Sequence, residues 1–301
     1  MYHMSSKPKK NEATNPGHKS NLIPGIVVIL IGVVLIVAVL SFSGILTFSN
    51  AHANTSSFNA PQYDTWGSFE KVSTSDYAPS GSTNIYYVSW IGCPIGAADS
   101  WVIYGALSQY SNVNSYVYTH HSSPNEGSYA CIPGLIFDQS FSVKANNINI
   151  NMDPVYLYNW TLFGEEGNNY KLPNGTGVQI ESPNSAQDPT LVNYGLSVAQ
   201  GKLPSPIYNI LKQYETVYPA TGTGGSPGAV SAELTSVYHL TTIMIITGAN
   251  GTYIFNGPFF NPPSLDQYSP VHIADNFPKI AEIKNAVGSL LTYLGLLLHF
   301  F

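Results

Sequence analysis

Charged side chains are scarce in this chain of 301 residues. Only 9% of its residues are Asp, Glu, Lys or Arg, whereas an average soluble protein has roughly 25%. The net charge is -6 and the lysines are scattered, so the sequence has no phosphate-neutralising basic face and a nucleic-acid partner is excluded. A polar surface of amides, hydroxyls and phenols keeps its hydrogen bonds when carboxylates are protonated. This composition therefore suits an acidic exterior or a glycosylated one.

Cysteine is nearly absent, since the chain has only Cys93 and Cys131. Cys93 begins the motif "CPIG", which stands between the strand-like run "IYYVSW" and a helix-like run, as a thioredoxin motif would. Gly96 occupies the place of the second cysteine of a CxxC motif. A loop without its resolving thiol cannot complete a dithiol–disulfide cycle within itself.

Motifs for other chemistry are also missing. The sequence has no GxSxG, HExxH or Walker motif and no paired carboxylates at a defensible spacing. His120 and His121 end a predicted strand near the Cys93 loop, but neighbouring strand residues point to opposite faces, so at most one of them can face the loop. No third ligand has metal-like spacing, and His239 is equally isolated. We predict no metal and no cofactor.

A long uncharged run near the amino terminus contrasts with this polar composition. Residues 22–46, "LIPGIVVILIGVVLIVAVLSFSGIL", carry no charge over 25 positions, and about 20 apolar residues span a membrane. Residues 1–21 hold four lysines and one acid, which predicts a cytoplasmic tail and an exterior carboxyl-terminal part. A cleaved signal peptide ending at "AHA", residues 51–53, is the alternative, but its apolar core would be about 7–15 residues long. We predict a single-pass anchor in the cell membrane.

Residues 47–62 are predicted to be a spacer, and residues 63–301 one large domain outside the membrane. Four asparagines after the anchor begin N-x-[ST] triplets, which are glycosylation acceptors on a translocated surface. They are Asn54, Asn159, Asn174 and Asn250.

The order of strand-like and helix-like runs predicts an α/β domain. Asn84–Trp90 has the aromatic and β-branched residues of a buried strand, and Ala97–Tyr110 has the spacing of a helix. Asn114–His121 alternates as a second strand, which a helical connection would place parallel to the first. The run 240–260 contains Asn250–Gly251, a hairpin signal, and residues 273–301 are mostly helical in pattern. Residues at about 135–235 are predicted to be an insertion.

The pattern "GCPIGAADSWVIYGALSQY" after "IYYVSW" resembles the archaeal domain-of-unknown-function family nine-two-nine. Members of that family look like membrane-anchored or secreted thioredoxin-like domains. The resemblance implies a thioredoxin-like fold, a central mixed sheet flanked by helices, preceded by one transmembrane helix. It also implies that Cys93 matches the attacking cysteine. Thioredoxins place a cis-proline before the late hairpin, whereas this chain has residues 239–242, "HLTT", there.

Cys93 is the one catalytic candidate, and three states of its thiol stay open. It is a structural disulfide partner of Cys131, an inert free thiol, or a working redox thiol whose pKa the helix amino terminus lowers. The sequence favours a cell-surface binding or interaction protein, with a cell-surface or membrane-complex protein as its partner. The alternative is a one-cysteine thiol-disulfide oxidoreductase or isomerase acting on exported proteins. Four tryptophans would suit a carbohydrate or peptide platform but fit a core better: Trp66, Trp90, Trp101 and Trp160.

Overall fold

The structure, a computed structural model, describes residues 58–164, 180, 182–222 and 226–296. The chain divides into the units Met1–Ser57 and Phe58–Phe301, and all described residues belong to the second. The predicted anchor at residues 22–46 and the acceptors Asn54 and Asn174 lie outside the described residues. Within the described residues, no helix combines the length and the apolar character that crossing a membrane requires.

Six strands form a central mixed sheet in the order β2-β10-β9-β3-β7-β6. Strands β3 and β7 are parallel, with partners from Ser82–Asn149 to Ser89–Tyr156, and the other neighbouring pairs are antiparallel. The six strands are β2 (Phe69–Ser73), β3 (Ser82–Ser89), β6 (Phe141–Ala145), β7 (Ile148–Tyr156), β9 (Ile243–Gly248) and β10 (Gly251–Asn256). The predicted α/β class, with a central mixed sheet flanked by helices, is confirmed.

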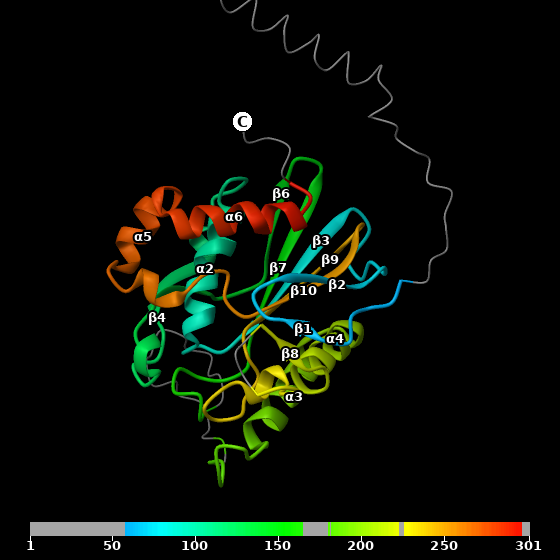
Figure 1. Cartoon of the computed structure of the whole chain (residues 1–301). Helices are drawn as coiled ribbons and strands as arrows, with labels where there is room; N and C mark the ends of the chain where they lie inside the picture. The colour runs from blue at the N-terminus through cyan, green and yellow to red at the C-terminus, as the bar shows by residue number, and fades with distance from the viewer. Residues whose placement is uncertain (1–57, 165–179, 181, 223–225, 297–301) are drawn as a thin grey trace, which may run out of the picture. The chain divides into compact units, whose positions relative to one another are not determined.

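Helices and two small sheets surround this sheet (Figure 1). The α-helices are α2 (Pro94–Leu107), α3 (Thr190–Lys202), α4 (Ser205–Thr216), α5 (Pro270–Asn276) and α6 (Ala281–Tyr293). The small sheets pair β4 (Val117–His121) with β5 (Pro133–Phe137), and β1 (Asp64–Thr65) with β8 (Ala220–Thr221). Short 3-10 turns are η1 (Asn114–Tyr116), η2 (Gly127–Tyr129), η3 (Ser231–Glu233), η4 (Pro262–Leu265) and η5 (Phe277–Lys279).

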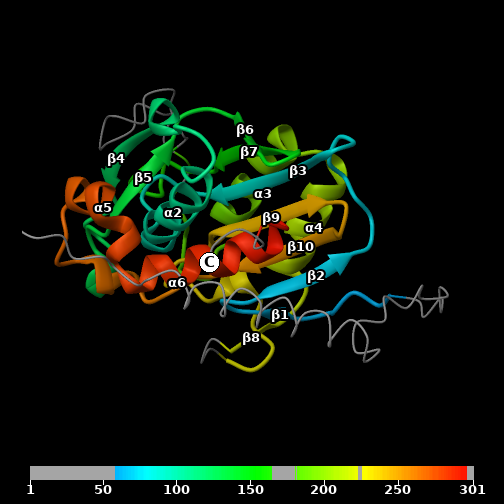
Figure 2. The same ribbon diagram turned by 90° about the horizontal axis from the view of Figure 1, so that it is seen from above.

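Both faces of the central sheet are covered, because successive strand residues point to opposite sides. Ile85 and Tyr87 of β3 belong to a buried cluster with α2 and α6. Tyr86 and Val88 belong to a second cluster, which includes residues of α3 and α4. Figure 2 shows α2 and α6 in front of the sheet and α3 and α4 behind it. A strand buried on both sides needs a nearly continuous apolar run, which explains "IYYV" in β3.

Helix α2 is buried around its whole circumference from Gly96 to Leu107. The helical spacing of this run predicted the helix but not that it is buried on all sides. The backbone of β5 lies directly against it, since a Cβ at Gly134 would be 2.5 Å from Ala97 Cα. The sheet, β5 and α6 all contact α2, and the Cys93 loop lies at the amino terminus of this helix.

The predicted second parallel strand is wrong. Residues Val117–His121 form β4, which pairs only with β5 in a separate sheet among the described residues. The parallel partner of β3 is β7, from the range 135–235 that we assigned to an insertion. The alternating polarity of "NSYVYTHH" is typical of a half-exposed strand, whereas β7 is an internal strand that α3 and α4 cover on one face.

Several local predictions are confirmed. Strands β9 and β10 form a hairpin with a register from Gly248–Gly251 to Ile243–Asn256, and Gly251 has a φ of 98° that favours glycine. Helix α6 lies within the run 273–301 that was predicted to be mostly helical, and it buries Ile283 and Leu290 in the core.

Candidate functional site

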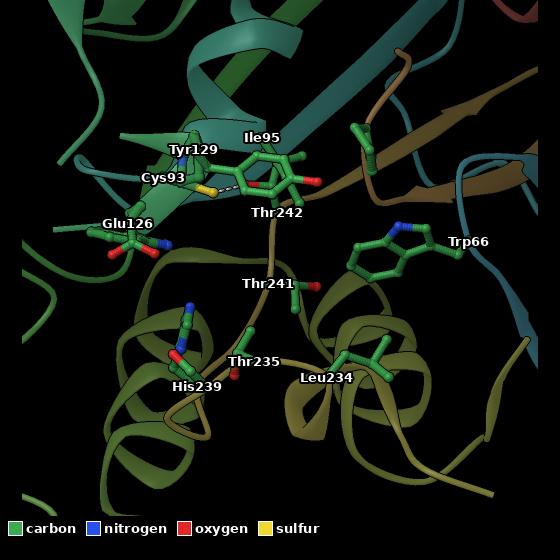
Figure 3. Close-up of a pocket in the computed structure, with 14 residues that line it drawn as sticks. Trp66, Cys93, Ile95, Glu126, Tyr129, Leu234, Thr235, His239, Thr241 and Thr242 are labelled. Atoms are coloured by element: carbon green, nitrogen blue, oxygen red, sulfur yellow. Dashed lines mark hydrogen bonds between the residues drawn. The ribbon is translucent and has the colours of Figure 1, made fainter. Parts of the chain in front are cut away.

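A cavity of about 250 Å³ opens beside the Cys93 loop (Figure 3). Its walls come from segments far apart in the chain: the start of α2, the region of η2, the segment after η3, and the residues that precede β9. In Figure 3, Cys93 lies above the cavity, His239 below it, and Trp66 and Glu126 on opposite sides. We refer to this cavity as the Cys93 pocket.

The Cys93 thiol is buried at 5% exposure in the wall of this pocket. Thr242 Oγ1 donates a hydrogen bond to Cys93 Sγ at 3.0 Å and lies 2.8 Å from Ser89 Oγ. Burial raises the pKa of the Cys93 thiol to about 11, and this effect outweighs the opposing effects of Thr242 and of nearby backbone amides. The helix amino terminus therefore does not produce the thiolate that redox exchange requires.

The surroundings of Gly96 leave no room for the side chain of a second cysteine. A Cβ at this position would lie 2.3 Å from Ser89 Oγ and 3.0 Å from the Tyr87 hydroxyl oxygen. The Tyr87 hydroxyl also donates a 2.7 Å hydrogen bond to the Gly96 carbonyl. The space for a second cysteine side chain is therefore filled by hydroxyl groups of β3.

The predicted disulfide between Cys93 and Cys131 is not formed. Both cysteines are free, and Cys131 is exposed whereas Cys93 is buried. The two loops are joined by backbone hydrogen bonds instead: Ser123 N–H donates to the Gly92 carbonyl (2.8 Å), and Cys131 N–H donates to the Ser123 carbonyl (3.2 Å). This backbone ladder brings the loops together while the Cys131 side chain faces solvent.

Two histidines near the pocket donate hydrogen bonds to backbone carbonyls and so stabilise the surrounding loops. His120 Nε2 donates to the Ile91 carbonyl at 2.7 Å, and burial lowers the His120 pKa to about 4, whereas His121 is exposed. One histidine of the pair thus contacts the loop, as predicted. His239 Nδ1 donates to the Val237 carbonyl at 2.6 Å, and burial lowers its pKa to about 4. Among the described residues, no three His, Cys, Asp or Glu side chains are grouped to hold a metal ion.

A buried network of polar side chains lies next to the pocket, and sequence reasoning missed it. Glu215 accepts hydrogen bonds from Thr241 N–H (3.0 Å) and Thr241 Oγ1 (2.6 Å). Asp64 Oδ2 accepts from Ser231 Oγ (2.6 Å) and Asn256 Nδ2 (2.8 Å). Thr241 joins this network to the pocket wall. These residues are isolated in the sequence, so no motif could have indicated the network.

The single hydroxyl hydrogen of Thr241 links its hydrogen bonds to the protonation state of Glu215. Thr241 Oγ1 lies 2.6 Å from Glu215 Oε1 and 2.8 Å from Asn256 Oδ1, but a hydroxyl has only one hydrogen to donate. If Thr241 donates to Asn256, the second contact needs a hydrogen from Glu215. Burial raises the pKa of Glu215 to about 7, and burial raises that of Asp64 to about 6. Glu215 is therefore neutral in acidic solution, where it can donate this hydrogen, and ionised in alkaline solution.

Two predicted glycosylation acceptors lie in the described residues. Asn159 is 1% exposed, and its Oδ1 accepts from Thr161 N–H (3.0 Å) and Thr161 Oγ1 (2.9 Å). A Cβ at Gly164 would lie 2.2 Å from Asn159 Nδ2, so the folded domain has no space for a glycan there. Asn159 therefore lies in a buried turn, whereas the sequence predicted an acceptor on the surface. Asn250 is exposed in the β9–β10 turn, and its glycosylation stays a prediction.

The four tryptophans have two kinds of surroundings. Trp66 and Trp90 line the Cys93 pocket. Trp101 is fully buried and donates to the Pro133 carbonyl at 2.9 Å, and Trp160 donates to the His121 carbonyl at 2.9 Å. The core interpretation holds for Trp101, while Trp66 is a half-buried wall of the pocket.

The fold and the site define a class: an α/β domain with a single protected cysteine above an aromatic pocket. The chain belongs to the family described as Domain of unknown function (DUF929), which matches residues 68–294. This confirms the family resemblance found in the sequence. Neither a curated protein nor a solved structure matches the chain.

Proposed function

We propose that this protein is a membrane-anchored binding domain with a degenerate thioredoxin-like fold, which holds a partner protein at the Cys93 pocket outside the cell. It binds without a cycle of thiol–disulfide exchange. The proposed location is the cell membrane, with a single anchor at residues 22–46 and the large carboxyl-terminal domain outside.

The strand order supports the thioredoxin-like part of the proposal. Within the larger sheet, β7, β3, β9 and β10 are neighbours in that order, with β3 and β7 parallel and β9 and β10 antiparallel. Helix α2 follows β3, helices α3 and α4 precede β9, and helix α6 follows β10. The Cys93 motif stands between β3 and α2, and Thr242 immediately before β9 contacts it. Thr242 thus stands where a thioredoxin would have its cis-proline.

The filled space at Gly96 is the single observation that carries the binding proposal. A redox loop needs room for its resolving thiol and a thiolate at its attacking cysteine. Here Ser89 Oγ and Tyr87 OH occupy the room, and burial keeps Cys93 protonated. The open pocket beside the loop remains available to a partner.

One labelling experiment tests both the topology and the state of the two thiols. On intact cells, a membrane-impermeant maleimide is expected to label Cys131, because this thiol is exposed and the domain is proposed to face outward. Cys93 is expected to react only after denaturation. Mass spectrometry identifies the labelled site, and Cys131→Ser should remove the native signal. Labelling of Cys131 only after cell lysis would contradict the outward topology, and rapid labelling of native Cys93 would contradict the protected thiol.

A turnover assay separates binding from enzymatic exchange. With a reducing agent and a protein disulfide substrate, the full chain is expected to give no more reduction than its Cys93→Ser variant. A Cys131→Ser variant is the matched control, because it removes the exposed thiol and leaves Cys93 in place. Robust reduction that Cys93→Ser abolishes and Cys131→Ser preserves would show that the one-cysteine oxidoreductase is correct.

A further inference from the structure

The chemistry of the Cys93 pocket indicates the class of group that it binds; this inference rests on the binding function proposed above. Aromatic rings and acceptor groups line the pocket together. Trp66, Trp90 and Tyr129 contribute aromatic surface, and Glu126 contributes a half-buried carboxyl group. None of the described lining residues is a lysine, and the chain has no arginine.

Trp66 is held in place by the backbone beneath it. A Cβ at Gly257 would lie 2.6 Å from two atoms of the indole ring, so the ring packs directly on the glycine backbone. Gly257 has a φ of 91°, which side-chain-bearing residues rarely adopt. The indole is thus fixed against the backbone at one side of the pocket before any partner arrives (Figure 3).

His239 adds an acceptor. Its Nδ1 donates to the Val237 carbonyl, and the lowered pKa keeps the ring neutral, so Nε2 carries a lone pair. The ring is fixed edge-on to Trp90, with the centroids 5.8 Å apart. His239 lines the pocket as an acceptor and not as a cation.

Two buried acidic groups also lie beneath the pocket. Thr241 lines the pocket and hydrogen-bonds Glu215, which shares Asn256 with Asp64. The Glu126 carboxyl group in the wall, with no lysine among the described lining residues, disfavours anions in the pocket. The faces of Trp and Tyr attract organic cations. A metal ion fits less well, because no three ligands are grouped among the described residues.

We propose that the Cys93 pocket binds the ammonium group of a lysine side chain presented by the partner protein. Glu126 lies opposite Trp66 and neutralises the ammonium charge, while the aromatic walls contact the aliphatic stem. His239 Nε2 accepts one of the ammonium hydrogens. Lysine suits this arrangement because its stem is apolar and its head is a compact cation.

The test compares two short peptides on the detergent-solubilised full chain. The peptide acetyl-Gly-Lys-Gly-amide is expected to bind, as measured by tryptophan fluorescence and calorimetry. The matched peptide with norleucine in place of lysine, which keeps the stem and lacks the ammonium, should bind at least about tenfold more weakly. Butylammonium chloride serves as a free-amine probe and should compete with the lysine peptide.

Two pairs of variants locate the binding. Glu126→Gln and Tyr129→Leu are each expected to weaken lysine-peptide binding by about fivefold to tenfold. Glu282→Gln and Tyr77→Leu are the matched controls; they change an exposed carboxyl and a similarly exposed ring outside the pocket, and should change nothing (Tyr77 is 37% exposed and Tyr129 41%).

The outcomes separate this inference from the proposed function. Equal binding of the norleucine and lysine peptides would overturn the ammonium inference while leaving a binding pocket. No binding of either peptide, or equal loss in the control variants, would also overturn it. The proposed binding function is tested separately by the turnover assay. Disulfide reduction that depends on Cys93 would contradict that function.

Discussion

The Glu215→Gln variant is expected to be more stable than the native chain at pH 8 and to lose that advantage by pH 4. Glu215 is completely buried and its pKa is raised from 4.5 to about 7, chiefly because burial disfavours the charged form. At pH 8 the native chain must hold an ionised carboxylate in this network. Glutamine stays neutral, and its amide can donate to Thr241 Oγ1 as the protonated acid does. A shift of this size corresponds to roughly 3 kcal/mol in the free energy of unfolding.

The direction of this pH dependence follows from the direction of the Glu215 pKa shift. Glu215 has a higher pKa in the folded chain than in the unfolded chain, so its stabilising contribution is complete below about pH 4.5 and is lost as pH rises through about 7. Asp64, raised from 3.8 to about 6, acts in the same direction. His120 and His239 act oppositely, because their lowered pKa values make their contributions complete above 6.5 and lost as pH falls through about 4.

The native chain and the Glu215→Gln variant have the same histidines. The difference between their free energies of unfolding therefore isolates the contribution of the Glu215 carboxyl group. When both proteins are unfolded by chemical denaturation from pH 4 to pH 8, the difference in their free energies of unfolding should grow with pH. Glu233→Gln, at an exposed glutamate, is the control for replacing a glutamate by glutamine. A flat difference for Glu215→Gln would show that Glu215 does not titrate in this range.

The Gly96→Cys variant, which restores the CxxC spacing, is expected to lose about 2–3 kcal/mol in the free energy of unfolding. Adding a side chain to a filled core forces neighbours out of their positions, and the new Cβ would lie 2.3 Å from Ser89 Oγ and 3.0 Å from Tyr87 OH. The Thr242–Cys93 hydrogen bond depends on the same small region. Restoring the motif should therefore weaken the domain without creating redox turnover.

The matched control for this variant is Gly201→Cys in α3. Gly201 is exposed, and a Cβ there meets nothing within 4 Å, so the change should leave stability nearly unaltered. Adding Ser89→Gly to Gly96→Cys removes the closest atom and should recover about half of the loss. Equal stability of Gly96→Cys and Gly201→Cys in chemical denaturation would contradict the account of a filled site.

The local elements were largely predictable because their signals are local. β3, α2 and the β9–β10 hairpin have continuous patterns of apolar, aromatic or turn residues. The pairing of β3 with β7 was not predictable, because "VYTHH" and "ININMDPVY" both have strand character. Which of them joins the sheet depends on long-range packing: β4 pairs with β5 and contacts α2 and α5, whereas the α3–α4 pair covers β7.

The candidate site was predictable only as a position in the chain. The sequence identified the Cys93 loop, its missing partner at Gly96 and the absence of a proline before the hairpin. It did not predict that Thr242, 149 positions away, would donate to the thiol. A glycine also says nothing by itself about which atoms fill the space beside it, and here those atoms belong to β3.

The sequence by itself determined the class of the domain, the family, the lone-cysteine motif and the low charge, because each is a property of composition or of residues close together in the chain. Only the tertiary structure decided the protonated state of Cys93, the exposure of Cys131, the buried Asn159 and the Asp64–Glu215 network. Those properties depend on burial and on hydrogen bonds between segments distant in sequence. Desolvation is a property of the packed chain, and it is the main reason that the Cys93 thiol stays out of its reactive form.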